Sequence, residues 1–221
     1  MPSERRLRRF VRRWRRRYPH PVDWVDDRAN RQCRRSENEW LAAYGGVAQL
    51  RRREVRALIS WAFTADPERR ERALQGTIAP AAWGHARRRI RRALAAEHAT
   101  EALDLLLESQ GGVTGWDVEV ASAVLAGCRP DDYVAADGRR LQALEALGLV
   151  MPRRTETVAR EDWLPFVKAC RRLSRVAEVP LVDVQRALWA AADRAPELPE
   201  RIPRTRRTAP GGRGSSPPRS G

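Results

Sequence analysis

The chain has 221 residues and a formal charge of +15, from 43 basic and 28 acidic side chains. This length suits one well-buried domain with terminal extensions, or at most two small domains. No stretch approaches the roughly 20 apolar residues of a membrane span, and neither the three cysteines nor the three histidines show the ligand spacing of a zinc or iron–sulfur centre.

Most of the positive charge lies at the two ends of the chain. Residues 1–17 hold nine arginines against one glutamate, and residues 196–221 hold six arginines against two glutamates. The part between them carries only +3. A nucleic-acid surface in the body of the protein must therefore come from local patches of arginine, not from bulk charge.

The first element is a predicted basic amphipathic helix over residues 1–19, which the following prolines end. Its apolar stripe has three-, four- and seven-residue spacing and consists of Leu7, Phe10, Val11, Trp14 and Tyr18. Three uses compete: packing on the domain, contact with phosphates, and binding to an anionic membrane. We rank packing first, because the stripe is short and its aromatic side chains suit the edge of a core.

Residues 20–195 are predicted to form one all-α domain, since they are rich in Ala, Leu, Arg, Glu and Trp and show helical spacing of apolar residues. Helix start signals are clearest at Ser36 with Glu39, and at Asp66 before Pro67. The expected helices are 22–34, 36–44, 50–64, 67–75, 80–96, 99–109, 116–127, 138–147, 160–174 and 179–193.

Residues 196–221 are rich in Pro, Gly and Arg and hold almost nothing to bury, so we expect a disordered tail. A basic tail of this kind can raise non-specific affinity for DNA by counterion release. It can equally be a solvated end with no role.

The most informative stretch runs from residue 101 to residue 137. It reads as a short apolar helix, a glycine-rich turn, and a second helix that begins with small residues. Thr114 and Asp117 have the spacing of a capping box for that second helix. The turn glycines permit a loop whose backbone amides could face a phosphate.

Over roughly residues 100–150 the order of motifs resembles, in divergent form, the helix-hairpin-helix DNA glycosylase superfamily. The resemblance rests on Gly112-Val113-Thr114-Gly115, on the Ala-rich segment from Val120 to Leu125, on Pro130-Asp131-Asp132-Tyr133, and on Asp137-Gly138-Arg139. It implies a compact multi-helix fold that contains the hairpin, duplex DNA as the partner, and release of a damaged base from a flipped nucleotide.

One departure from the family concerns its lysine nucleophile, because Glu119 stands at the position that aligns with it. A carboxylate forms no Schiff base, and the only lysine of the chain, Lys168, lies outside the motif. A lysine-dependent lyase step is therefore disfavoured. Asp117 also puts negative charge where a phosphate would sit, which weakens the phosphate-binding interpretation.

The resemblance implies that Asp137 is the catalytic carboxylate, stabilising positive charge on the deoxyribose and orienting water. The competing interpretation is structural, since Asp137 precedes a helix and Asp is a favoured N-cap. Glu119 fits a solvated helix position better than a general acid. For the base pocket or a DNA wedge the candidates are Trp61, Trp83, Trp116 and Trp163, of which Trp116 lies beside the hairpin, although it could equally be a packing residue.

The expected DNA contacts combine the turn, the start of the helix after Asp137, and an arginine run. They are Gly112, Thr114, Gly115, Trp116, Arg139, Arg87, Arg88 and Arg91. The run from Arg87 to Arg92 contains no acid, which favours a phosphate patch, although such a run is more often the wet face of a helix. His85 is expected to serve packing or a local hydrogen bond.

Three functional hypotheses follow: a monofunctional DNA glycosylase that uses Asp137, a catalytically silent DNA-binding relative, and a helical interaction protein whose basic ends bind RNA or an acidic partner. We rank the glycosylase first. We expect a cytoplasmic, nucleoid-associated monomer that uses no metal, no cofactor and no membrane. The identity of the damaged base does not follow from the sequence, because a base pocket is built from residues distant along the chain.

Overall fold

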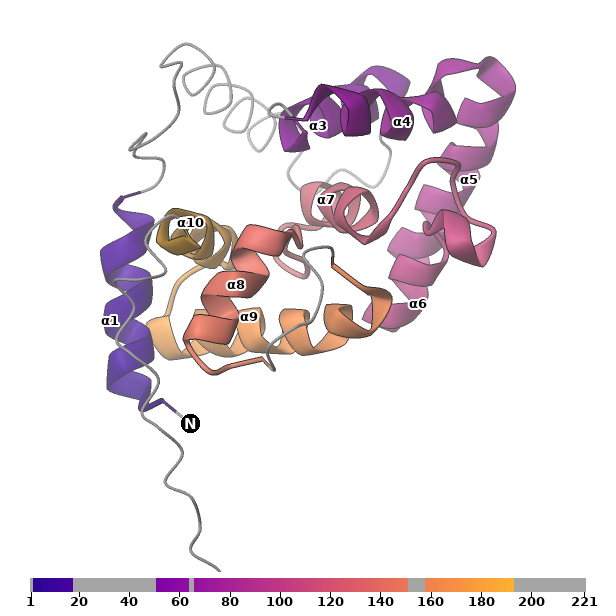
Figure 1. The fold of residues 1–221 in the computed structure, drawn as a ribbon. Coiled ribbons are helices and arrows are strands. Elements are labelled where there is room, and N and C mark those ends of the chain that lie inside the picture. The colour runs from indigo at the N-terminus through magenta and orange to yellow at the C-terminus, as the bar shows by residue number, and fades with distance from the viewer. Residues whose placement is uncertain (1, 18–50, 64–65, 151–157, 193–221) are drawn as a thin grey trace, which may run out of the picture.

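The computed structural model describes residues 2–17, 51–63, 66–150 and 158–192, and within these ranges it contains helices and connecting turns but no strand (Figure 1). The all-α class is confirmed for this part of the chain. The predicted helices 22–34 and 36–44 and the predicted disordered tail lie outside the described residues.

The helices follow the predicted order, and most of their ends lie within three residues of the predicted ones. Short 3-10 turns stand at Glu108–Gln110 and Arg160–Asp162. The α-helices are α1 (Glu4–Arg15), α3 (Arg52–Ala62), α4 (Pro67–Ile78), α5 (Pro80–Ala95), α6 (Ala99–Asp104), α7 (Val118–Cys128), α8 (Gly138–Ala146), α9 (Trp163–Ala177) and α10 (Leu181–Ala192).

α4 begins as its sequence indicates but ends later than expected. The Asp66 side chain accepts a hydrogen bond from the Arg69 amide at 3.0 Å, and Pro67 occupies the first helical position. The helix then continues through Gly76, where we expected a break. A Cβ at Gly76 would collide with the carbonyl oxygen of Thr114, so this glycine allows close packing of α4 on the turn before α7.

α6 is shorter than predicted, ending at Asp104 instead of residue 109. The carbonyl oxygen of Leu106 accepts a hydrogen bond from the Val113 amide at 3.0 Å, and that of Leu107 accepts from Gly112 at 2.8 Å. These carbonyls bond across the turn instead of along a helix. We call the connection from residue 105 to residue 117 the α6–α7 turn.

α1 docks on the domain by its apolar face, as expected. Leu7, Phe10, Val11 and Trp14 are buried, and the helix packs against α10 and α9. At the rim of this contact Arg15 forms an ion pair with Asp183 at 2.7 Å. In Figure 1, α1 lies at one end of the molecule, whereas α5 lies at the other.

α7 is the central helix, and every one of its residues except Glu119 is buried. A helix that is apolar on all sides belongs in a core, and α7 packs against α3, α5 and α6. Ser122 ties it to the segment that leads into α8, because the Ser122 hydroxyl accepts a hydrogen bond from the Ala136 amide at 2.9 Å. This bond brings the start of α7 and the start of α8 together.

Candidate nucleic-acid interface

α5 presents a face of arginines to solvent. Its sequence contains no acidic residue, and its other side buries Ala86, Ile90 and Ala93 against the core. Four exposed guanidinium groups have no ion pair within the described part of the chain, and these residues form what we call the α5 arginine face: Arg87, Arg88, Arg91 and Arg92. Unpaired guanidinium groups on a rigid helix suit binding to phosphate.

The α6–α7 turn is fastened to the same helix, beside the arginine face. His85 donates from Nε2 to the carbonyl oxygen of Gly112 at 2.8 Å, and Arg89 donates to the carbonyl oxygen of Gly111 at 2.6 Å. The expectation of a local hydrogen bond for His85 is thus confirmed. These two bonds hold Gly111 and Gly112 of the turn against α5, and Thr114 of the same turn is exposed.

The backbone amides of the three turn glycines, Gly111, Gly112 and Gly115, are committed within the protein, contrary to the expectation that they face a phosphate. Gly111 donates to the Glu108 carbonyl oxygen at 2.9 Å, and Gly115 donates to the Glu108 carboxylate at 3.1 Å. The Gly112 amide donates to Leu107, as described above. In this structure Gly112 and Gly115 therefore offer no free amide to DNA.

The glycines of the turn have a packing reason instead. Gly115 has φ +78°, and a Cβ there would collide with the carbonyl oxygen of Arg72 on α4. A Cβ at Gly112 would overlap the backbone of Leu106 and Leu107. Gly111 differs, because it has φ +70° but open space around it.

Trp116 belongs to the core and not to the surface. Its side chain is 1% exposed, and its indole Nε1 donates to the carbonyl oxygen of Ala73 at 3.0 Å. It is therefore not available as a DNA wedge in this structure. Trp163 is also fully buried, and Trp83 is partly buried against the core; the Trp61 side chain lies outside what the structure describes.

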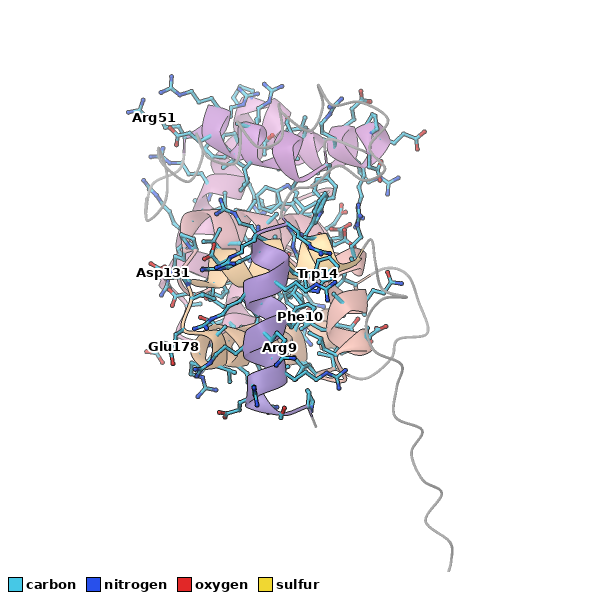
Figure 2. All side chains as sticks on the ribbon, turned by 90° about the vertical axis from the view of Figure 1, so that its left-hand side faces the viewer. Arg9, Phe10, Trp14, Arg51, Asp131 and Glu178 are labelled. Atoms are coloured by element: carbon cyan, nitrogen blue, oxygen red, sulfur yellow. The ribbon has the colours of Figure 1, made fainter. Side chains whose placement is uncertain are left out.

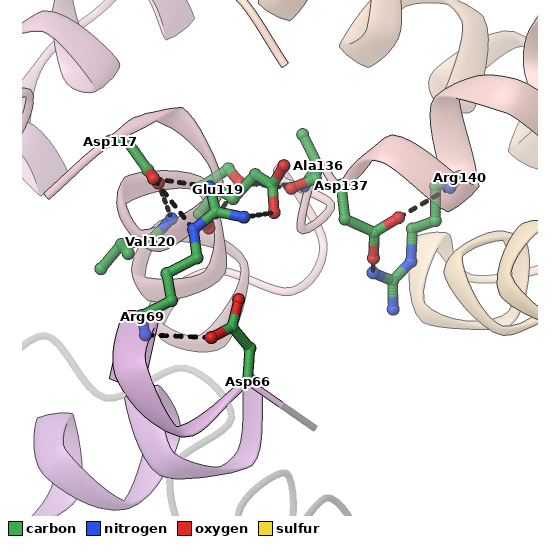
Figure 3. A network of polar contacts seen from close by, with 9 residues as sticks. Asp66, Arg69, Asp117, Glu119, Val120, Ala136, Asp137 and Arg140 are labelled. Atoms are coloured by element: carbon green, nitrogen blue, oxygen red, sulfur yellow. Dashed lines mark hydrogen bonds and ion pairs between the residues drawn. The ribbon is translucent and has the colours of Figure 1, made fainter. Parts of the chain in front are cut away.

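Arg69 of α4 bridges two acids at the start of α7 (Figure 3). Its guanidinium contacts the Asp117 carboxylate at 2.5 Å and the Glu119 carboxylate at 2.8 Å. Asp117 itself caps α7, accepting from the Val120 amide at 3.0 Å. The predicted capping box was therefore misplaced, because Asp117 stands at the N-cap and Thr114 lies outside the helix.

Glu119 is buried more deeply than a solvated helix residue, with its side chain only 11% exposed. The pKa of Glu119 is raised to about 7, chiefly by burial, which Arg69 opposes and to which the negative charges of Asp137 and Asp117 add. The carboxyl group can therefore carry a proton near neutral pH. The interpretation of Glu119 as an exposed surface residue is corrected.

Asp137 caps α8 and forms an ion pair within the same helical turn. Its carboxylate accepts a hydrogen bond from the Arg140 amide at 2.7 Å and also contacts the Arg140 guanidinium. Its side chain remains 25% exposed, whereas that of Arg140 is almost fully buried. The structural interpretation of Asp137 as an N-cap is thus confirmed, and its negative charge contributes to the raised pKa of Glu119.

The Arg139 side chain packs on Trp189 of α10, whereas we expected it to contact DNA. Its guanidinium lies 4.7 Å from the ring centroid of Trp189, a cation–π geometry. Burial lowers the pKa of Arg139. The side chain is partly buried, so it offers less to a phosphate than the α5 arginine face does.

Sequence reasoning missed the contacts of three arginines, Arg69, Arg89 and Arg140. Arg69 pairs with acids 48 and 50 residues away, a contact with no local signal. Arg89 was noted only as part of the charge run, although it fastens the turn. Arg140 could have been found, because an acid and an arginine at i and i+3 on a helix are neighbours.

No protein-family model, curated protein or solved structure matches this chain. Among the described residues, no cluster of His, Cys, Asp or Glu is suited to a metal ion. None of the described helices is long and apolar enough to cross a membrane.

Proposed function

We propose that this protein binds duplex DNA through the α5 arginine face and the adjoining α6–α7 turn. The observation that carries the proposal is a set of four exposed guanidinium groups on a helix without acids, none with an ion pair among the described residues. Charges of alternating sign are typical of a solvated helix face laced with salt bridges, and α5 has no acid to form such pairs. Arginines without a protein partner can neutralise phosphates and release counterions without first breaking a salt bridge.

The turn adds positioning to this electrostatic surface. Thr114 is exposed, and the hydrogen bonds of His85 and Arg89 hold the turn against α5. An exposed threonine hydroxyl is a side chain suited to contact with the sugar-phosphate backbone. The resemblance to the helix-hairpin-helix glycosylase superfamily supports duplex DNA over other polyanions.

Fluorescence anisotropy with a labelled duplex tests this proposal. Replacing all four arginines by glutamine (R87Q/R88Q/R91Q/R92Q) is expected to weaken binding by on the order of a hundredfold or more at about 0.1 M salt. The matched lysine variant (R87K/R88K/R91K/R92K) keeps the charge and is expected to keep most of the affinity. Unchanged binding by the glutamine variant contradicts the proposal.

Base release at Asp137 is a second candidate function, favoured by one specific observation. Asp137 is partly exposed and pairs with Arg140, and its charge is among the causes that raise the pKa of Glu119 to about 7, so that Glu119 can hold a proton near neutral pH. Cleavage of a glycosidic bond commonly uses two carboxyl groups in different protonation states. In such a step Asp137 would stabilise the charge on the sugar, and Glu119 could protonate the departing base.

Asp137→Asn separates catalysis from structure, because asparagine is an equally good N-cap. The enzyme hypothesis predicts base release from lesion-containing duplexes, detected by alkaline cleavage, that Asp137→Asn abolishes while duplex binding persists. Binding without base release across a panel of lesions favours the catalytically silent relative. Absence of any preference for duplex favours the interaction protein that binds RNA or an acidic partner.

A further inference from the structure

α1 carries a second arginine surface on the side that faces away from the domain. Its members follow one another at spacings of four, three and four residues, which places them on one side of the helix. All four are exposed and have no side-chain ion pair within the described ranges; they form what we call the α1 arginine stripe: Arg5, Arg9, Arg12 and Arg16. By contrast, Arg8 and Arg15 pair with Glu178 and Asp183 at the rim of the docked face.

The apolar face of α1 is already occupied, which decides what the stripe can bind. An amphipathic helix that enters a membrane surface needs its apolar side free. Here Leu7, Phe10 and Trp14 are buried against α9 and α10. Only the arginine side remains for a partner, and charge complementarity favours a polyphosphate backbone.

The length of the stripe fits such a backbone. Arg5 and Arg16 are eleven residues apart, or about 16 Å along a helix at 1.5 Å per residue. A duplex carries a phosphate about every 3.4 Å of axis on each strand, so a duplex segment of this length holds enough phosphates to pair with four guanidinium groups. Because α1 is packed on two helices, its guanidinium groups project from a fixed scaffold.

α1 and α5 lie at opposite ends of the molecule (Figure 1). α1 packs mainly on α9 and α10, whereas α5 packs mainly on α4, α6 and α7. Figure 2 looks at the molecule from the α1 end, with that helix in front. We propose that the α1 arginine stripe binds a second duplex segment, so that one chain bridges two DNA segments, an inference that rests on the proposed binding of DNA by α5.

Capture of a second duplex tests this bridging. The full-length protein is loaded on beads that carry an anchored duplex of about 20 base pairs, two helical turns, and a free fluorescent duplex of the same length is then added. The wild-type protein is expected to retain the free duplex. The stripe variant R5Q/R9Q/R12Q/R16Q is expected to bind the anchored duplex but to retain at least tenfold less of the free one.

Controls distinguish the stripe from other causes of lost capture. Glutamine preserves helix propensity, and the lysine variant R5K/R9K/R12K/R16K is expected to retain the free duplex. Raising salt from about 50 to about 200 mM is expected to lower the affinity for the second duplex about a hundredfold, as for four phosphate contacts. Light scattering checks that the protein on its own is a monomer, since self-association could also join two duplexes.

The outcomes separate this inference from the proposed function. If the stripe variant retains as much of the free duplex as the wild-type protein does, the bridging inference is overturned, but the proposed binding by α5 is not affected. Full affinity of the α5 glutamine variant for a single duplex overturns the proposed function instead. If the stripe variant loses binding to anionic vesicles but not capture of the second duplex, the stripe is a membrane contact and bridging is overturned.

Discussion

Glu119 shares its surroundings with one cation and two other acids. Arg69 holds its carboxyl group, while Asp117 and Asp137 add negative potential. Because burial is the largest cause of the raised pKa, the native state keeps this proton up to about pH 7, whereas the unfolded chain releases it near 4.5. Ionised Glu119 therefore costs native stability as the pH rises through this range.

Glu119→Gln is expected to remove this pH dependence. Between about pH 5 and pH 8 the variant should gain on the order of 2 to 3 kcal/mol of unfolding free energy relative to wild type. Urea unfolding followed by tryptophan fluorescence at several pH values measures the difference. A constant difference across the range would show that Glu119 does not titrate there.

Asp137 stabilises the start of α8 as its N-cap and as the partner of Arg140. Asp137→Ala removes the N-cap of α8 and leaves the nearly buried Arg140 without its carboxylate, so it is expected to destabilise the protein by about 2 to 4 kcal/mol. Asp137→Asn keeps the cap and should cost less. Equal thermal stability of Asp137→Ala and wild type would argue against the capping role.

Individual residues were predictable where the signal is local. The caps at Asp66 and Asp137 follow from an acid directly before a helical pattern. The burial of Trp116 and Glu119 did not follow, because it depends on α4 packing over the start of α7. The resemblance to a glycosylase also favoured a surface role for Trp116, where the structure has a core indole bonded to Ala73.

The α6–α7 turn adjoins the α5 arginine face, and packing explains two of its glycines, Gly112 and Gly115. Gly115 combines a positive φ with close contact to α4, whereas Gly111 has a positive φ alone. The two positions therefore separate backbone strain from steric overlap.

Gly115→Ala is expected to cost about 3 kcal/mol, from left-handed backbone strain together with overpacking against Arg72. Gly111→Ala should cost only about 1 kcal/mol from strain. Denaturant unfolding of both variants measures this order. Equal losses at the two positions would contradict the close approach of the turn to α4.

The apolar face of α1 is buried against α9 and α10, so removing one of its side chains should destabilise the protein. Leu7→Ala is expected to lower stability by about 2 to 5 kcal/mol, as for other leucines removed from a core. Arg9→Ala, on the exposed side of the same helix, should stay within about 0.5 kcal/mol of wild type. A negligible loss in Leu7→Ala would mean that α1 does not pack as described.

Helices were predictable from apolar spacing, but two ends were not. Gly76 was interpreted as a stop signal, although α4 continues through it because the turn packs there. The end of α6 was missed because Leu106 and Leu107 bond across the turn, which leucine spacing alone does not indicate. The docking of α1 was predictable, since its apolar stripe is short and opposite a continuous arginine face.

At the scale of the whole molecule, the formal charge of +15 says little about where DNA binds. The structure distinguishes arginines engaged in protein contacts, such as Arg69 and Arg140, from exposed ones, which include the sets on α1 and α5. The sequence predicted a basic N-terminal helix and a local patch near residues 87–92. It could not place them at opposite ends of the molecule, because that depends on tertiary packing.

The salt dependence of duplex binding tests the central claim most directly. The stripe variant R5Q/R9Q/R12Q/R16Q is the starting protein, because it leaves α5 as the arginine surface under test. The slope of log affinity against log salt concentration is measured for this variant and for the same variant that also carries R87Q/R88Q/R91Q/R92Q. Loss of four phosphate contacts is expected to reduce the slope by about 3.6. An unchanged slope would show that the α5 arginine face does not contact the DNA backbone.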